Sequence, residues 1–130
     1  MTKPEILIVD DDEAFCRELV RALGQRGIAA NWTASPVELS KGLCGTPDIV
    51  LLDLGMPGID GFEVIEAISR FAVKPHIIVA SGYSDRIINA AAKSAIGFGI
   101  PVLGRLEKPY SLIELIKLLG FVDKGYPEFD

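Results

Sequence analysis

The sequence predicts an α/β fold in which helices cover both faces of a parallel sheet. Short aliphatic runs alternate five times with segments of helical periodicity along the 130 residues, and this alternation is typical of parallel strands joined by helices. The runs are apolar at successive positions, as expected of strands that are buried on both faces. The length is that of one domain, and 49% apolar residues suffice for a core without disulfides.

Each predicted strand is a run of aliphatic residues, many of them β-branched, bounded by charged or turn-forming residues. The first and third runs are unbroken, and the second is the weakest because it is interrupted by Asn31 and Trp32. The predicted strands span residues 6–9, 28–34, 48–53, 76–80 and 101–106.

Each predicted helix follows its strand and places apolar residues three or four positions apart. Cap residues mark the starts: Asp12, Ser35, Ser84 and Ser111 are expected N-caps, and Asp60 is expected in a turn or as an N-cap. Both Ser35 and Ser111 are followed three residues later by Glu, which predicts a capping box. The predicted helices span 12–23, a segment that opens at 35, 62–68, 84–95 and 111–119.

Composition excludes several classes of function. The 18 acidic and 13 basic residues leave a net charge of −5, which argues against binding of this domain to nucleic acids or anionic membranes. Cys16, Cys44 and the single histidine, His76, form neither a disulfide framework nor a zinc motif. The start lacks a signal-peptide pattern, and the uncharged stretch 94–104, which no other uncharged stretch exceeds in length, is too short to span a bilayer. We therefore expect a cytoplasmic location.

Polar residues gather where the predicted strands end. In an open parallel sheet, ligands bind beyond the carboxyl ends of the strands, so residues there are candidates for function. We expect three carboxylates, one hydroxyl and one ammonium to meet at that edge. They belong to Asp10 and Asp11 after the first strand, Asp53 at the end of the third, Ser81 after the fourth and Lys108 after the fifth.

This set favours phosphoryl chemistry with a divalent metal. Three neighbouring carboxylates repel one another, and Mg²⁺ relieves that repulsion while it keeps positions open for phosphate oxygens. Mg²⁺ and the Lys108 ammonium together would neutralise the three acids and stabilise charge on a transferring phosphoryl group. One of the carboxylates can then act as a nucleophile and form an aspartyl phosphate.

These residues resemble the receiver domain of two-component response regulators, a CheY-like family. The resemblance spans residues 4–119 and is carried by Val-Asp-Asp at 9–11, the segment 52–61, Ala-Ser-Gly at 80–82 and Lys-Pro-Tyr at 108–110. It implies a flavodoxin-like, doubly wound (βα)5 sandwich of three layers with strand order 2-1-3-4-5. It also assigns residues 1–120 to the receiver domain and 121–130 to a C-terminal tail, which would begin a linker to an output domain.

The resemblance assigns roles to the residues at the strand ends. Asp53 would be the phosphoacceptor, which takes its phosphoryl group from a sensor histidine kinase or a phosphotransfer protein. Asp10, Asp11, Asp53 and the backbone carbonyl of Gly55 would hold Mg²⁺ or Mn²⁺.

Ser81 and Lys108 would each contact a phosphoryl oxygen, and the Lys108–Pro109 peptide is expected to be cis. Phosphorylation would switch a protein contact surface over residues 84–119, toward an output domain or target; a homodimer is left open. Such a chain is not a turnover enzyme but a phosphotransfer acceptor with at most slow autodephosphorylation.

The chain departs from the family pattern at several positions. Arg105 stands where receivers usually have an aromatic switch residue, and we expect it to contact either the phosphoryl group or a partner. The long stretch 95–104 resembles receivers attached to cyclic-dinucleotide phosphodiesterases. Gly55 has no side chain to orient water and Tyr83 is bulky enough to shield the site, which predicts slow hydrolysis of the phosphoryl group.

Three alternatives involve other functions on similar folds. A Mg²⁺-dependent phosphatase with an aspartate nucleophile typically has a second Asp two residues later, where this chain has Gly55. A docking module independent of phosphorylation would be expected to have lost an acid or the lysine, and none is missing. A flavin-binding protein would need a Ser/Thr/Gly-rich phosphate loop after the first strand, which is absent from the sequence.

Overall fold

The computed structural model describes residues 4–41, 45–82 and 85–123. Within them five parallel strands form one sheet in the order β2-β1-β3-β4-β5, which confirms the predicted topology. The strands are β1 (Ile6–Val9), β2 (Ala30–Thr33), β3 (Ile49–Asp53), β4 (His76–Ser81) and β5 (Val102–Glu107).

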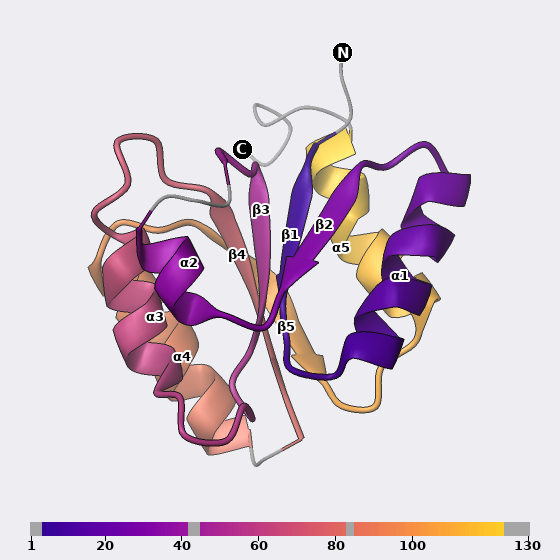
Figure 1. The fold of residues 1–130 in the computed structure, drawn as a ribbon. Coiled ribbons are helices and arrows are strands. Elements are labelled where there is room, and N and C mark those ends of the chain that lie inside the picture. The colour runs from indigo at the N-terminus through magenta and orange to yellow at the C-terminus, as the bar shows by residue number, and fades with distance from the viewer. Residues whose placement is uncertain (1–3, 42–44, 83–84, 124–130) are drawn as a thin grey trace.

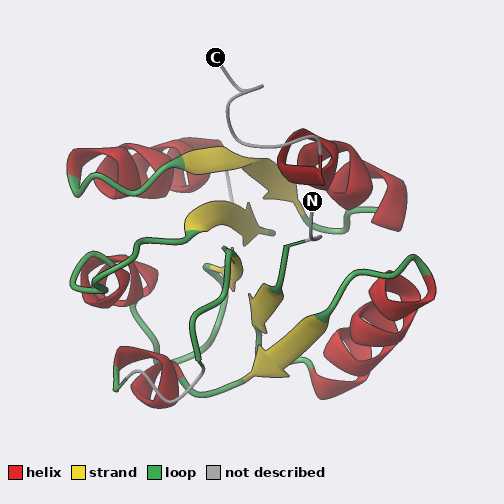
Figure 2. Ribbon diagram, turned by 90° about the horizontal axis from the view of Figure 1, so that it is seen from above, coloured by secondary structure: helices red, strands yellow, loops and turns green. Residues whose placement is uncertain are grey.

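Helices cover both faces of this sheet (Figures 1 and 2), as the apolar strands predict. The helices are α1 (Glu13–Gln25), α2 (Pro36–Ser40), α3 (Gly61–Ile68), α4 (Asp85–Gly97) and α5 (Leu112–Asp123). In Figure 1, α1 and α5 lie on one side of the sheet, and α2, α3 and α4 lie on the other. No helix in the described part of the chain is long and apolar enough to span a membrane.

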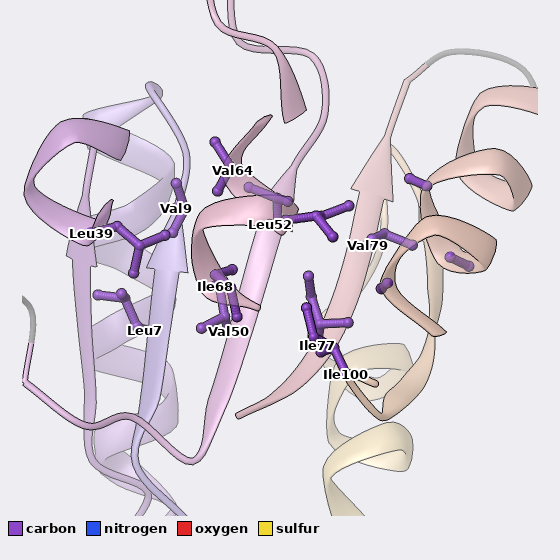
Figure 3. Close-up of a cluster of buried hydrophobic side chains, with 14 of the residues drawn as sticks. Leu7, Val9, Leu39, Val50, Leu52, Val64, Ile68, Ile77, Val79 and Ile100 are labelled. Atoms are coloured by element: carbon purple, nitrogen blue, oxygen red, sulfur yellow. The ribbon is translucent and has the colours of Figure 1, made fainter. Parts of the chain in front are cut away.

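Alternate side chains of each strand build two separate cores, because successive residues of a strand point to opposite faces. In β1, Leu7 and Val9 belong to the core under α2, α3 and α4, whereas Ile6 and Ile8 belong to the core under α1 and α5. Figure 3 shows the first core, where Leu7 and Val9 lie near Leu39 of α2. All residues of β1 and β3 are buried, so both strands are packed on both faces next to the residues that follow them.

Local hydrogen bonds explain where most helices begin. The Asp12 carboxylate accepts the backbone N–H of Phe15 at 3.0 Å, and Asp60 accepts that of Phe62 at 2.9 Å, so both aspartates are N-caps. The capping box at Ser111 is complete, since Ser111 and Glu114 exchange backbone-to-side-chain bonds of 3.1 and 3.3 Å.

The box predicted at Ser35 is only half right. Ser35 accepts the N–H of Glu38 at 3.3 Å, but its own N–H donates to the Thr33 hydroxyl at 3.0 Å instead of to the Glu38 side chain. Thr33 is the last residue of β2 and lies two positions from Ser35 in sequence, whereas Glu38 lies three positions away. The predicted cap Ser84 lies outside the described residues.

Three helices end later than predicted. Helix α4 ends at Gly97, two residues beyond the predicted end at residue 95. Helix α1 continues through Gly24 to Gln25, and the chain turns at Gly27, whose φ of 78° suits glycine. Helix α5 continues through Gly120 to Asp123, beyond the predicted end at Leu119. At Gly24 and Gly120 a Cβ atom would meet nothing within 4 Å, so these glycines mark neither a turn nor a close approach.

Candidate functional site

Sheet register brings Asp10 and Asp53 together. Val9 of β1 pairs with Leu52 of β3. Each of the two is followed by an aspartate, Asp10 directly after β1 and Asp53 as the last residue of β3. Asp10 is also held by its backbone N–H, which donates to the carbonyl of Thr33 at 3.1 Å. Both carboxylates therefore leave the sheet at the same edge, as predicted for the ends of parallel strands.

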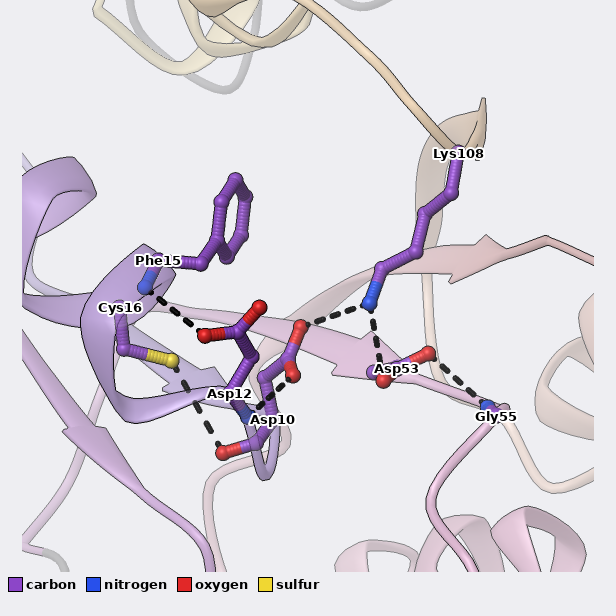
Figure 4. Close-up of polar contacts among 7 residues, drawn as sticks. All are labelled: Asp10, Asp12, Phe15, Cys16, Asp53, Gly55 and Lys108. Carbon is purple, nitrogen blue, oxygen red and sulfur yellow. Dashed lines mark hydrogen bonds and ion pairs between the residues drawn. The ribbon is translucent and has the colours of Figure 1, made fainter.

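The Lys108 ammonium bridges the two carboxylates, as Figure 4 shows. Its Nζ donates to Asp10 Oδ2 at 2.9 Å and to Asp53 Oδ2 at 3.0 Å. The side chains of Asp10 and Asp53 are only 3% and 5% exposed, whereas that of Lys108 is 29% exposed. Lys108 thus forms one charged cluster at the edge of the sheet with two carboxylates that lie 98 and 55 positions away in sequence.

The second oxygen of each buried carboxylate accepts a backbone N–H group. Asp53 Oδ1 accepts the N–H of Gly55 at 2.9 Å, and Asp10 Oδ1 accepts that of Asp12 at 3.0 Å. Each carboxylate therefore has one oxygen fixed by its own loop and one directed to Lys108, which orients both groups toward the same space.

Asp11 completes an acidic triad. It is exposed, and one carboxylate oxygen from each of Asp10, Asp11 and Asp53 lies within 4.8 Å of the other two. Hard oxygen donors with high negative charge suit Mg²⁺ or Mn²⁺. A single ammonium balances only one of the three charges, so this donor set fits a divalent cation.

Electrostatics keep Lys108 charged. Burial lowers the pKa of its ammonium, but the hydrogen bonds and the attraction from Asp10 and Asp53 outweigh this effect, so the pKa lies above its ordinary value. The group is thus a permanent cation near neutral pH and can stabilise negative charge that develops beside Asp53.

Ser81 and the cis peptide also lie at this edge. Ser81 is fully buried at the end of β4, one residue beyond Ala80, which pairs with Asp53. The Ser81 carbonyl accepts the backbone N–H of Lys108 at 2.8 Å. The Lys108–Pro109 peptide bond is cis, as predicted.

Arg105 lies elsewhere. Its exposed side chain lines a cavity between α4 and β5 together with Asp85, Asn89 and Glu107. The cavity contains none of the carboxylates that Lys108 bridges. Contact between Arg105 and a phosphoryl group or a partner stays a prediction.

The sequence did not predict that two aromatic rings, those of Phe15 and Tyr110, lie beside the charged cluster. The Lys108 Nζ lies 5.8 Å from the centre of the Phe15 ring, and the Phe15 and Tyr110 rings meet edge to face, with centroids 5.7 Å apart. The helical spacing of Phe15 indicated only a core position. The signal that could have placed it here is its position in the first turn of α1, four residues after Asp11.

Cys16 lies behind the cluster and takes no part in it chemically. Its thiol donates to the backbone carbonyl of Asp10 at 3.8 Å. Burial, and then the negative charges of Asp10 and Asp12, raise the pKa of this thiol to about 12. A thiol that stays protonated is a poor nucleophile, so Asp53 is the better candidate for covalent chemistry.

Comparisons with known proteins agree with this geometry. A family model described as "Response regulator receiver domain" matches residues 6–120. The acid tolerance regulatory protein ActR of Rhizobium meliloti (strain 1021) is 35% identical over 115 residues, which cover 88% of this chain and 57% of ActR. This chain therefore matches little more than half the length of that relative.

Two solved structures are similar over nearly the whole chain. A response regulator from Colwellia psychrerythraea has a TM-score of 0.77 and 26% identity, and the match covers 94% of this chain and 98% of that one. The beryllofluoride-activated NtrC receiver domain has a TM-score of 0.72 and 26% identity, over 97% of this chain and 98% of that one.

Proposed function

This chain belongs to the response regulator receiver domain family, and we propose that it accepts a phosphoryl group on Asp53 and thereby switches a protein contact surface. The observation that carries the proposal is the Lys108 ammonium, which joins Asp10 and Asp53 at 2.9 and 3.0 Å beside a third acid. A purely structural role would not require three neighbouring carboxylates with a single cation.

Asp10, Asp11, Asp53 and the backbone carbonyl of Gly55 are the proposed ligands of Mg²⁺ or Mn²⁺. When bound, the metal supplies positive charge to phosphoryl oxygens. The carboxylates of this triad are oxygen donors within 4.8 Å of one another, and Gly55 is already joined to Asp53 through its N–H group, which places its peptide in the same loop.

In the proposed reaction, an Asp53 carboxylate oxygen attacks the phosphorus atom of a phosphohistidine on a sensor kinase or a phosphotransfer protein. The new O–P bond forms as the P–N bond breaks, and the leaving imidazole takes up a proton from solvent. Lys108 stabilises negative charge on the phosphoryl oxygens because it is already fixed beside Asp53 Oδ2. The Ser81 hydroxyl is proposed to donate to another of these oxygens.

The contact surface is proposed over residues 84–119, of which 85–119 are described. Exposed apolar side chains there include Ile87, Ile96 and Ile113, and they are available to an output domain, a target protein or a second copy. Arg105 lies on the same surface, at the cavity beside α4. A cytoplasmic location is part of the same proposal, since sensor kinases act on receivers there.

The phosphoryl group is proposed to be long-lived, and the domain is an acceptor with slow autodephosphorylation. Gly55, two residues after Asp53, has no side chain to position an attacking water. The other residue invoked for this property, Tyr83, lies outside the described residues.

The test is incubation of the chain with Mg²⁺ and acetyl phosphate, with Asp53→Ala as the control. We expect one phosphoryl adduct on the wild type, none on the variant, and a change in self-association or partner binding on phosphorylation. A wild-type chain without any adduct contradicts the proposal. An adduct of equal yield on Asp53→Ala would contradict the assignment of Asp53.

A further inference from the structure

An aromatic pair joins the start of α1 to the loop after β5, next to Lys108. Phe15 lies in the first turn of α1, and Tyr110 follows Lys108 by two residues. The two rings are nearly perpendicular, at 89°, with centroids 5.7 Å apart, which is a favourable arrangement for aromatic rings. Neither ring takes part in the proposed phosphoryl transfer.

The face of Phe15 lies within reach of the ammonium. Lys108 Nζ is 5.8 Å from the ring centroid, inside the range of about 6 Å over which the electron-rich face attracts a cation. Two N–H groups of the ammonium are directed to Asp10 and Asp53. In Figure 4 the ring lies on the α1 side of the two carboxylates.

The ring is itself held in place. The Phe15 backbone N–H donates to the N-cap Asp12 at 3.0 Å, and Phe15 and Tyr110 both pack against the core under α1 and α5. A lysine, by contrast, has a flexible four-carbon stem and a strongly hydrated head. A fixed ring can therefore restrict a side chain that is otherwise free to swing into water.

We propose that Phe15, supported by Tyr110, is a positioning residue that holds the Lys108 ammonium at Asp53 through the face of its ring. Because cation–π attraction at partly exposed sites is modest, loss of the ring face should lower the equilibrium constant between the productive and the swung-out positions of Lys108 by about two- to fivefold. The kinetic consequence rests on the proposed function of Asp53, whereas the placement of Lys108 does not.

Phe15 could instead act only as a packing residue, and two substitutions separate these roles. Phe15→Leu keeps an apolar side chain of similar size but removes the ring, whereas Phe15→Tyr keeps the ring face. Phe71→Leu is the matched control, because Phe71 is also a partly buried phenylalanine but packs against the other core.

The experiment has two readouts. The first is the rate of Asp53 phosphorylation by phosphoramidate with Mg²⁺, measured for the wild type and the three variants. The second is the NMR order parameter of the Lys108 ε-methylene group in metal-free protein, because a side chain held in one position moves less than one that swings into water.

We expect Phe15→Leu to slow phosphorylation by about two- to fivefold and to lower the Lys108 order parameter. Phe15→Tyr should retain the wild-type rate and order parameter, and Phe71→Leu should match the wild type. Equal slowing by Phe15→Leu and Phe15→Tyr, or an unchanged Lys108 order parameter in Phe15→Leu, would overturn the proposal. A wild type that takes no phosphoryl group contradicts the proposed function instead, because the Lys108 order parameter still tests the role of the ring.

Discussion

Removal of the Lys108 charge tests the electrostatic account of the site most sharply. In the wild type, Lys108 Nζ lies 2.9 Å from Asp10 Oδ2 and 3.0 Å from Asp53 Oδ2. In Lys108→Met, both carboxylates stay buried next to Asp11 without this cation. With an effective dielectric constant of about 20, each attraction is at most about 6 kcal/mol. Loss of one partner of a fully buried pair costs about 3–5 kcal/mol, and loss of an exposed pair costs less than about 1 kcal/mol.

The Lys108 side chain is 29% exposed, so water screens part of the attraction and an intermediate value applies. We expect Lys108→Met to lower the free energy of unfolding by about 2–3 kcal/mol. For a domain of this size, that is a fall in Tm of roughly 6–15 °C. The control is Lys93→Met, which removes an exposed lysine of α4 and should change stability by less than about 0.5 kcal/mol.

The assay is urea unfolding at pH 7 with a chelator present, so that no divalent cation compensates for the lost charge. It is repeated for Asp53→Asn and for the double variant. The double variant should be more stable than the sum of the single effects indicates, by at least about 1 kcal/mol. Additive effects, or a Lys108→Met variant as stable as Lys93→Met, would refute the reasoning.

Three further predictions concern single groups that are not members of the acidic triad. Asp60→Ala removes the N-cap bond to Phe62 and should destabilise the domain by about 1 kcal/mol in urea unfolding; an unchanged midpoint would argue against the cap. The Cys16 thiol, whose pKa burial raises to about 12, should resist labelling by a thiol reagent at pH 8 in a Cys44→Ser background until urea unfolds the chain; rapid labelling of the folded protein would contradict its burial. Burial also lowers the pKa of His76, an effect that Asp48 partly offsets. Below about pH 6.5 the unfolded state therefore binds more protons than the folded one, and the stability decreases as the pH decreases. His76→Gln should therefore lose less stability than the wild type between pH 7 and pH 5, and equal losses would count against this origin.

The fold could be predicted because its signals are local. The aliphatic run of β1 is buried on both faces, and an unbroken apolar strand is stable only inside a covered sheet. The ends of α1 and α5 were missed because Gly24 and Gly120 lie inside these helices. Glycine weakens a helix by only about 1 kcal/mol, which tertiary packing readily offsets.

Part of the candidate site could be predicted from the sequence and part could not. Asp10 and Asp53 could be placed together from sequence because parallel strands end at one edge, and the observed pairing of Val9 with Leu52 brings them together there. The ring of Phe15 could not be placed beside Lys108, since their proximity depends on how α1 packs against the loop after β5. That packing involves side chains far apart in sequence, and no local pattern records it.

The central claim is that Asp53 is the residue that carries the phosphoryl group, and chemical trapping of the product tests it most directly. Borohydride reduces an aspartyl phosphate to homoserine, so the chain is treated with Mg²⁺ and acetyl phosphate, reduced, digested and sequenced by mass spectrometry. The account predicts homoserine at position 53 and aspartate at positions 10 and 11. Homoserine at one of those other positions, or at none, would contradict it.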